Sequence, residues 1–512
     1  PESFTPDDMY YLGEAVETKD FWIAAGFNSV GIQSAGGAGM VLAEWINNGS
    51  PPMDVGTVDA KRSQPFQNNS RYLSERVSET LGLLYADHFP YRQYETSRGV
   101  RRSPVHDRLE AKGACFGEAS GWERANWFLP PDAKAAGEVA EYQYSWGRTN
   151  WFDYSGCEHH SLRNSVGLYD MSSFGKITVQ GRDSEAVLQM LCANDVAVEP
   201  GKIVYTQLLN DCGKIEADVT VTRLSPDSYI IVTGAATCRR DMSWISRHIP
   251  EEARCVAVDT TASEAVFCVM GPGSRDFLQP LTADSLSNED FKFGTQQTIE
   301  IGYGIARAHR VSYVGELGWE LYVSSDQAVH VFDALTDAGN EDRSGLPLLC
   351  GLHAMDSCRV EKGYRHYGHD HVLDHVLEDH VLEAGLGFAV KSGKEAGFAG
   401  QDFIGKDAVA RKKGEGLSTR LLQFKLEDPN PLLFHNEAVL RDGEVVGYLT
   451  SGAFAHTFGS SIGLGYVPCR HAGETAKEQL ASNYIIEVAS KQFTAKVSLK
   501  PFYDAKGKKT KL

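Results

Sequence analysis

One stretch of this sequence places acidic, aromatic and glycine residues within a short bend. Residues 311–323, "VSYVGELGWELYV", carry Tyr313 and Glu320 around two glycines, and the apolar ends of the stretch predict strands. A carboxylate has two acceptor oxygens and pairs with adjacent N–H donors such as those of pterins, guanidines and amidines. Tyrosine can stack on a flat ring, and glycine lets such a ligand approach the backbone. The stretch permits a flat, donor-rich ligand without requiring one.

A second acidic position lies beside a turn in residues 210–224, "NDCGKIEADVTVTRL". Asp211 and Gly213 mark the turn, and Asp218 opens the strand predicted after it. A carboxylate there can cap the turn. It can also act as a general acid or base, or as the fixed negative charge that stabilises a cationic intermediate. Both interpretations stay open at this point.

A glycine-rich segment lies near the start of the sequence. Residues 21–46 predict a strand at Phe21–Ala25, a tight turn over 28–39 and a helix from Met40 onward. The glycines provide clearance for a helix that packs on a sheet, or they expose a helix N-terminus to an anion or an electron-rich ring. The spacing is not G-x-G-x-x-G followed by a ribose-binding acid, so the segment is not a self-sufficient dinucleotide site.

The tetrapeptide D-H-V-L occurs three times within residues 370–386. His371 and His375 lie four residues apart, which is a spacing found in metal sites. No H-E-x-x-H is present, and no cysteine or aspartate obviously completes a ligand set. We therefore expect an amphipathic surface helix or a local duplication here, and we predict no metal site.

Composition restricts the classes of function. The 512 residues are 42% hydrophobic and 23% charged, which is an ordinary globular balance. The formal net charge of -18 disfavours nucleic acid and anionic membranes as partners, because these carry charge of the same sign. Ten cysteines without a C-x-x-C pair indicate reduced thiols, hence a bacterial cytoplasm or a mitochondrial matrix. No stretch approaches the ~18 apolar residues of a membrane helix. The sequence opens "PESFTPD" without a methionine, so we expect residues upstream, including any targeting segment.

The order of predicted elements indicates α+β layers. Linkers are predicted at 47–54 and 129–138, and residues 60–130 are predicted to be helical or irregular. Strands are predicted at 175–181, 218–224 and 228–234, and helices at 184–193 and 238–249. After residue 418, an Asp442–Gly443 turn between two strands predicts a hairpin within a small β-barrel or sandwich.

At these residues the chain resembles a known family. From about Ser155 onward it is similar to the folate-binding aminomethyltransferase (T-protein) domain of the glycine cleavage system. The whole chain resembles more closely the C-terminal part of the dimethylglycine and sarcosine dehydrogenases. The matching stretches are collinear: "PESFTPD", "GFNSVGIQSAGGAG", "RRSPVHDRLEAKGA", "GWERANWF", "GLYDMSSFGK", "SYVGELGWELYV", "RVEKGYRH", "LEAGLGFAV", "FIGKDA" and "GYLTSGAF".

The resemblance implies an α+β, multidomain fold in four parts. These are the C-terminal remnant of a FAD-dependent oxidoreductase domain, a central domain, a T-protein-like aminomethyltransferase domain and a small β-barrel, over residues 1–48, 49–154, 155–417 and 418–512. Residues 1–48 begin at the last strand and helix of the flavin domain. They can cap a flavin site but cannot build one, so FAD would bind only with an upstream segment or a partner that supplies the rest.

The resemblance also implies a function and its residues. In that family a FAD domain oxidises an N-methyl amine, and the one-carbon unit passes to tetrahydrofolate in the C-terminal half. Asp218 matches the catalytic aspartate, and Tyr313, Glu320 and Arg359 match folate-binding positions. Asn28, Ser29, Gly31 and Ile32 match the turn near the flavin.

Two alternatives remain beside this enzyme. The regulatory subunit of pyruvate dehydrogenase phosphatase shares the architecture and binds a protein partner, but is expected to lack the glutamate equivalent to Glu320. A folate-dependent demethylase of another methylated substrate is the second alternative. The "GFNS" and "GWER" stretches favour the flavin-linked branch. The expected partners are an N-methyl amine and tetrahydrofolate.

Overall fold

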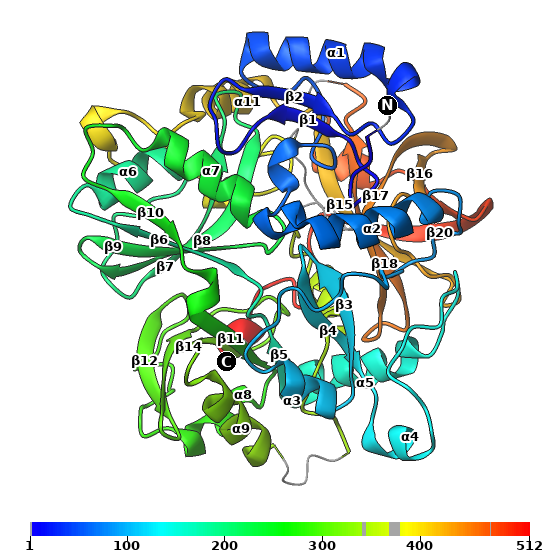
Figure 1. Cartoon of the computed structure of the whole chain (residues 1–512), viewed down its shortest axis with the longest axis vertical. Coiled ribbons are helices and arrows are strands. Elements are labelled where there is room, and N and C mark those ends of the chain that lie inside the picture. The colour runs from blue at the N-terminus through cyan, green and yellow to red at the C-terminus, as the bar shows by residue number, and fades with distance from the viewer. Residues whose placement is uncertain (1–2, 340–344, 368–378, 472) are drawn as a thin grey trace.

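A computed structural model describes residues 3–339, 345–367, 379–471 and 473–512. In Figure 1 the N-terminal hairpin and helix lie along the top edge, the two large sheets lie one below the other on the left, and the barrel lies on the right. The repeated D-H-V-L segment, with His371 and His375, lies largely outside the described residues. None of the helices in the described ranges is both long and apolar enough to cross a membrane.

The N-terminal part is a two-stranded sheet covered by one helix. Strand β1 (Tyr11–Glu14) pairs with β2 (Trp22–Ala25), and helix α1 runs over Gly31–Asn48. The predicted turn over 28–39 is therefore mostly wrong: only Asn28 and Ser29 take positive φ angles, of 46° and 65°. The glycines that follow are helical, because Ala38, Val41 and Trp45 give α1 one buried face.

The next part contains a hairpin that the sequence did not predict. Residues 60–130 include β3 (Ala114–Ala119) paired with β4 (Trp122–Phe128), besides α2 (Ser70–Leu83) and α3 (His106–Ala111). Gly121 sits in the turn with φ of 81°, a backbone angle that favours glycine. The remaining helical segments of this part are η1 (Ala60–Arg62), η2 (Pro65–Asn68) and α4 (Pro131–Ala135).

The first large sheet has five antiparallel strands in the order β10-β6-β9-β8-β7. Their bounds are β6 (Gly175–Gln180), β7 (Ile203–Leu209), β8 (Ile215–Ser225), β9 (Ser228–Thr233) and β10 (Val256–Asp259). Helices α6 (Ser184–Leu191) and α7 (Cys238–His248) accompany it. The predicted strands and helices of this region are confirmed, because their apolar periodicity matches one buried core.

The second large sheet has the order β12-β13-β14-β11-β5. Its strands are β5 (Gly167–Asp170), β11 (Glu264–Met270), β12 (Gln296–Ile301), β13 (Gly304–His309) and β14 (Gly318–Ser324), with α8 (Ser274–Leu278) and α9 (Ala328–Ala338). Val311 and Tyr313 were predicted to be in a strand, and this is wrong. The preceding strand ends at His309, and residues 310–317 form a loop in which Gly315 has φ of 84°.

The remaining elements join the sheets to a closed barrel. Helices α5 (Trp151–Asn164) and α10 (Leu352–Glu361) pack on each other, and α10 also packs on the barrel. The barrel closes in the order β15-β18-β17-β16-β19-β20. Its elements, with the preceding helix, are α11 (Lys406–Glu415), β15 (Thr419–Leu426), β16 (Ala438–Arg441), β17 (Glu444–Ala455), β18 (Ser460–Pro468), α12 (Ala476–Leu480), β19 (Tyr484–Val488) and β20 (Lys491–Ser498).

The predicted barrel and its hairpin are confirmed. Asp442 and Gly443 have φ angles of 52° and 91°, as the turn between β16 and β17 requires. The chain then returns from the barrel to the second sheet, where the C-terminal end lies near β11 (Figure 1). The backbone oxygen of Leu512 accepts hydrogen bonds from Arg275 and Arg310, at 2.7 and 2.9 Å.

Candidate functional site

Asp218 lies on the face of the first sheet that is turned toward the second sheet. Its neighbours Ala217 and Val219 belong to the core that the first sheet forms with α6 and α7. Because side chains alternate along a strand, Asp218 lies on the opposite face. Two residues of β9 on that face, Ile230 and Val232, belong to the core shared with β5, β11 and β14 of the second sheet. Asp218 therefore projects toward the space between the sheets.

Glu320 reaches the same space from the second sheet. Trp319 and Leu321 are buried in that sheet's outer core, so Glu320 and Tyr322 lie on its inner face. The register partner of Glu320 on β11 is Cys268, which belongs to the core between the sheets. The two carboxylates, 102 residues apart in the numbering of the sequence, thus come from facing sheets.

Two side chains of the neighbouring strand hold the carboxylate of Asp218. Gln207 is its register partner on β7 and donates from Nε2 to Oδ1 at 2.9 Å. Tyr205 donates from its hydroxyl to Oδ2 at 2.8 Å. Burial raises the pKa of Tyr205 well above 10, and the charge of Asp218 raises it further, so the phenol stays protonated as the donor. Both carboxylate oxygens are thereby fixed in direction.

Tyr313 lies close to this arrangement. Its hydroxyl donates to the backbone oxygen of Arg365 at 2.8 Å, and its ring stacks on Tyr364 with centroids 6.2 Å apart. The side chain packs against the core between the sheets. The positive charge of Arg365, the residue whose backbone oxygen accepts from Tyr313, lowers the pKa of Tyr205, the donor to Asp218. We call Tyr205, Gln207, Asp218, Tyr313, Glu320 and Tyr322 the inter-sheet group.

Glu320 is the titratable acid of the inter-sheet group. Its Oε2 accepts a hydrogen bond from the Tyr322 hydroxyl at 2.8 Å. Burial raises the pKa of Glu320 to about 7, and the bond from Tyr322 only partly opposes this. The register partner of Glu320 on β13 is His309. This imidazole is neutral, because burial holds its pKa well below 6.5. No cation stabilises Glu320 among the described residues that contact it, so an N–H donor would find a ready acceptor.

The opposite side of the loop over residues 310–317 is held by an ionic cluster. Glu316 is fully buried and accepts from Arg163 at 3.2 Å and from the Tyr503 hydroxyl. Arg163 also donates to the backbone oxygen of Val314 at 2.6 Å and to Glu361 at 2.9 Å. We call Arg163, Glu316, Glu361 and Tyr503 the buttress. The buttress fixes the loop over residues 310–317, which contains Tyr313 and leads into β14, the strand that contains Glu320.

Arg359 is not part of the inter-sheet group. Its guanidinium is fully buried and donates to Asp356 at 2.7 Å, to the hydroxyl of Ser451 on β17 at 3.1 Å and to the backbone oxygen of Tyr364 at 3.3 Å. It therefore joins α10 to the barrel. Its bond to Tyr364, which stacks on Tyr313, links it indirectly to the inter-sheet group.

The four residues assigned to the flavin-proximal turn form a separate group at α1. Asn28 is buried. Its Oδ1 accepts a hydrogen bond from the backbone nitrogen of Thr5 at 2.8 Å, and its Nδ2 donates to the Thr5 hydroxyl at 3.0 Å. Ser29 has a positive φ angle, Gly31 begins α1, and Ile32 is fully exposed. Helix α1 has no acidic residue in its first turn. Figure 1 shows it on the far edge of the molecule from β11 and β14.

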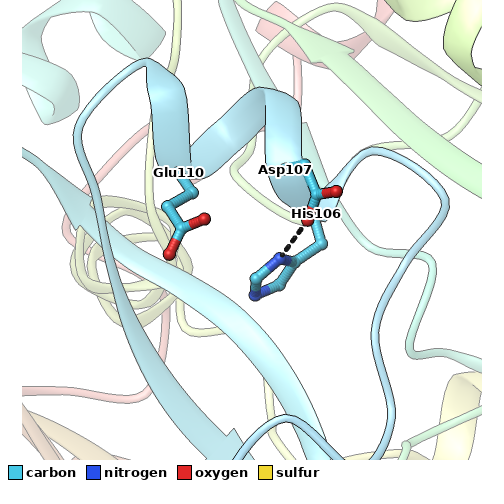
Figure 2. A group of neighbouring side chains, drawn as sticks. All are labelled: His106, Asp107 and Glu110. Carbon is cyan, nitrogen blue, oxygen red and sulfur yellow. Dashed lines mark hydrogen bonds and ion pairs between the residues drawn. The ribbon is translucent and has the colours of Figure 1, made fainter.

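One group of side chains has the composition of a metal site. His106, Asp107 and Glu110 on α3 offer ligand atoms that lie within 4.8 Å of one another (Figure 2). His106 is buried and stacks on Phe116, whereas Asp107 is exposed and bonds the imidazole Nδ1 at 3.2 Å. Exposed acids often gather in this way without an ion, and we assign no function to the group.

The sequence reasoning missed four residues around the two carboxylates: Tyr205, Gln207, His309 and Tyr322. Two signals were present. The predicted turn at Asp211–Gly213 implies a hairpin that brings residues 205–207 opposite Asp218. Tyr322 lies two residues after Glu320 in a strand and thus on the same face. His309 required the pairing of β13 with β14, which no local pattern indicates.

The sequence matches three family descriptions in succession. Residues 48–103 match "FAD dependent oxidoreductase central domain", 105–394 match "GCVT N-terminal domain" and 419–504 match "Glycine cleavage T-protein C-terminal barrel domain". The second of these matches alone covers more than half of the chain.

Known proteins align over the whole chain. It is 42% identical over 509 residues to a 4-methylaminobutanoate oxidase (formaldehyde-forming) of Paenarthrobacter nicotinovorans, covering 99% of this chain and 59% of that protein. It is 34% identical over 546 residues to the mitochondrial sarcosine dehydrogenase of Mus musculus, covering 100% of this chain and 58% of that protein. The chain thus spans about three fifths of the length of these relatives.

A solved structure supports the fold. The crystal structure of the glycine cleavage system aminomethyltransferase T from Bartonella henselae superposes with a TM-score of 0.64 at 21% identity, covering 79% of this chain and 99% of that one. The predicted α+β fold with a C-terminal barrel is confirmed by this match and by the family descriptions.

Proposed function

This chain belongs to the glycine cleavage T-protein (GCVT) family, and from that premise we propose that it transfers a one-carbon unit from a demethylated N-methyl amine to tetrahydrofolate. The observation that supports the proposal is that Asp218 and Glu320 lie on the inward faces of two facing sheets and that Tyr313 packs against the core between those sheets. A reduced pterin presents a flat ring with an N–H donor edge, which suits this set of side chains.

In this proposal Glu320 binds the donor edge of the pterin. A carboxylate with a pKa of about 7 is partly protonated at neutral pH, and a pair of N–H donors favours its ionised form. Tyr322 orients one oxygen of Glu320. Tyr313 packs on the folate ring or bonds to it, and the buttress keeps its loop in place.

Asp218 has the chemical role. Tetrahydrofolate supplies the nucleophilic nitrogen that receives the carbon. Asp218 would accept the proton that leaves this nitrogen as the new carbon–nitrogen bond forms, and would return a proton to the amine as the bond from the carbon to that amine breaks. Its negative charge would stabilise the cationic, iminium-like transition state. Tyr205 and Gln207 fix the direction of its oxygens in advance, so little reorganisation is needed.

The amine-oxidising step belongs to a flavin half that these residues do not build. The N-terminal hairpin and α1 offer a turn at Asn28, Ser29, Gly31 and Ile32 that would lie near FAD held by an upstream segment or partner. The curated relatives named above are longer than this chain and act on amines that carry a carboxylate. We extend that substrate class to this protein. We also propose a bacterial cytoplasm or a mitochondrial matrix as its compartment.

The alternatives have less support. Retention of Asp218, Tyr313 and Glu320 as one group favours an enzyme over a non-catalytic regulator. A demethylase of another methylated substrate would use the same group, so only the flavin half distinguishes it.

Calorimetric titration of the chain with tetrahydrofolate tests the proposal. We expect saturable binding in the micromolar range, and a Glu320→Gln variant to bind about tenfold to hundredfold more weakly, because a charge-assisted pair contributes about 1.5–3 kcal/mol. Glu300→Gln, at an exposed acid on β12, is the matched control and keeps wild-type affinity. Absence of heat with the wild-type chain, or recovery of a phosphatase from an extract without folate binding, overturns the proposal.

A further inference from the structure

A cavity lies where the N-terminal part and the β3–β4 hairpin meet the first sheet. It has a volume of about 270 Å³, and its lining comes from both sides of that contact, including Val16, Trp122 and Gly175. It contains none of the residues of the inter-sheet group. We propose that this cavity binds the carboxylate of a small amino acid, with Arg101 as its counter-ion.

The charges around the cavity leave one guanidinium without a carboxylate. Three arginines line it. Arg239 is paired with Glu17, and Arg247 with Glu14. Arg101 has no carboxylate within 4.0 Å among the residues that the structure describes, and its side chain donates only to the backbone oxygen of Ser120, at 3.3 Å. An anion bound beside Arg101 would supply the missing partner.

The ring of Trp122 fixes the guanidinium of Arg101. The guanidinium carbon lies 4.3 Å from the ring centroid, and Trp122 also lines the cavity. Such stacking occupies one face of the guanidinium and leaves its N–H edges for hydrogen bonds. Burial lowers the pKa of Arg101 below its usual value, and the negative charge of Asp259 opposes this only in part, so the guanidinium is poorly solvated in the free protein.

Three further residues of the lining have buried polar atoms without a partner. These atoms are Nε2 of Gln64 and the hydroxyl oxygens of Ser173 and Ser243. Their residues are 9%, 5% and 7% exposed. Buried polar atoms almost always have hydrogen-bond partners in folded proteins. An amide and two hydroxyls offer donors, and a carboxylate offers about four lone-pair sites to receive them.

The size and second charge of the cavity define the ligand class. A volume of about 270 Å³ is below the range of drug-sized ligands, so folate and flavin are too large. Burial raises the pKa of the Cys238 thiol in the lining to about 12, and this side chain therefore adds no competing anion. Asp259 is exposed and also lines the cavity, so an amine on the same ligand would meet an acid. A small amino acid carries both groups.

The test is a titration of the whole chain with ¹³C-labelled acetate and glycine, followed by NMR. We expect saturable binding of both, tighter for glycine, and none of methylammonium. Arg101→Met should weaken both by about tenfold or more, since a hydrogen bond to a charged group contributes about 1.5–3 kcal/mol. Arg102→Met is the control with unchanged binding, because that neighbouring side chain is about half exposed, at 54%.

Other variants keep the proposal open to failure. Ser243→Ala should weaken acetate binding severalfold while leaving the fold intact. If Arg101→Met does not fold, Ser243→Ala serves as the test variant in its place. Asp259→Asn should abolish the preference for glycine over acetate. The proposal is overturned by absence of saturable binding, by equal binding in the Arg101 and Arg102 variants, or by phosphate binding more tightly than acetate. Glu320→Gln leaves this cavity unchanged. Failure of amino acid binding at the cavity can therefore be distinguished from failure of folate binding at the inter-sheet group.

Discussion

The two glutamates of the stretch "YVGELGWE" lie four residues apart and have opposite surroundings. Glu316 faces the buttress, where an arginine and a tyrosine hydroxyl engage it. Glu320 faces the inter-sheet group, where a single tyrosine hydroxyl contacts it and its pKa rises to about 7. An acid that is paired with a cation holds the loop in place, even though Oε2 of Glu316 has no hydrogen-bond partner, whereas an acid without a cation among the described residues is available to a ligand.

The largest effect is expected from breaking the buttress. Arg163→Met leaves Glu361 buried without its cation and Glu316 with only Lys509, at 3.8 Å, and such a loss costs about 3–5 kcal/mol of the free energy of unfolding. Urea denaturation measures it. Arg108→Met, at an exposed pair with Asp333, is the control and changes stability by less than about 0.5 kcal/mol. A loss in Arg163→Met as small as in the control would show that the buttress does not hold the loop.

Chemistry on the inter-sheet side should fail without loss of binding. Asp218→Asn keeps the hydrogen bond from Tyr205 but removes the proton acceptor, so transfer slows about 10²-fold while folate affinity stays within about threefold. The measurement is the ratio of methylenetetrahydrofolate to free formaldehyde in the protein that carries its flavin half. An unchanged ratio would assign Asp218 to structure alone.

The two glutamates should respond oppositely in stability. Glu320 has a pKa of about 7 in the folded chain against 4.5 unfolded, so the folded state holds more protons between these values and loses stability as the pH rises through 7. Glu320→Gln should therefore raise the free energy of unfolding at pH 8 by about 1–3 kcal/mol, and by little at pH 4. Burial raises the pKa of Glu316 as well, but Glu316→Gln should lower the free energy of unfolding, because it removes the ion pair with Arg163. Two variants of the same sign would remove the distinction.

Folate binding should follow the charge of Glu320. Binding to the ionised carboxylate is strongest above the pKa of about 7 and weakens as the pH falls through it. The limit is about tenfold per pH unit, given that one proton competes with the ligand. Calorimetry from pH 5.5 to 8.5 measures this slope. In Glu320→Gln the slope should be absent, and its persistence there would assign it to another group.

The smallest effect is expected at Tyr503. Tyr503→Phe removes the hydrogen bond to Glu316 and the one that the hydroxyl accepts from Lys509. Because Arg163 and Lys509 both stay beside Glu316, the cost is only about 0.5–1.5 kcal/mol of stability. Since the loop then holds Tyr313 less firmly, folate affinity should fall by about twofold to fivefold. Thermal denaturation and calorimetry on the same sample measure both. Tyr303→Phe, at an almost fully exposed ring, is the control.

Local patterns predicted regular elements where the periodicity matched one core. Strands β6, β8 and β9, helices α6 and α7, and the Asp442–Gly443 hairpin were predicted correctly. The errors fell where tertiary packing overrode local preference. Glycines predicted to form a turn are helical in α1, because one face of that helix is buried. Val311 and Tyr313 favour strand, yet the contact of Arg163 with Val314 holds a loop there.

The sequence by itself determined the family, the order of the domains and three of the acidic and aromatic residues at the site, because motifs and strand periodicity are local properties of the chain. Only the tertiary structure decided which faces these residues occupy. It brought Tyr205 and Gln207 to Asp218 and turned Glu316 away from Glu320. It also placed Arg359 at the barrel and left Arg101 beside a cavity without a carboxylate within 4.0 Å among the described residues. The physical reason is that burial and charge pairing depend on residues distant in sequence, which sheet pairing and helix packing bring together.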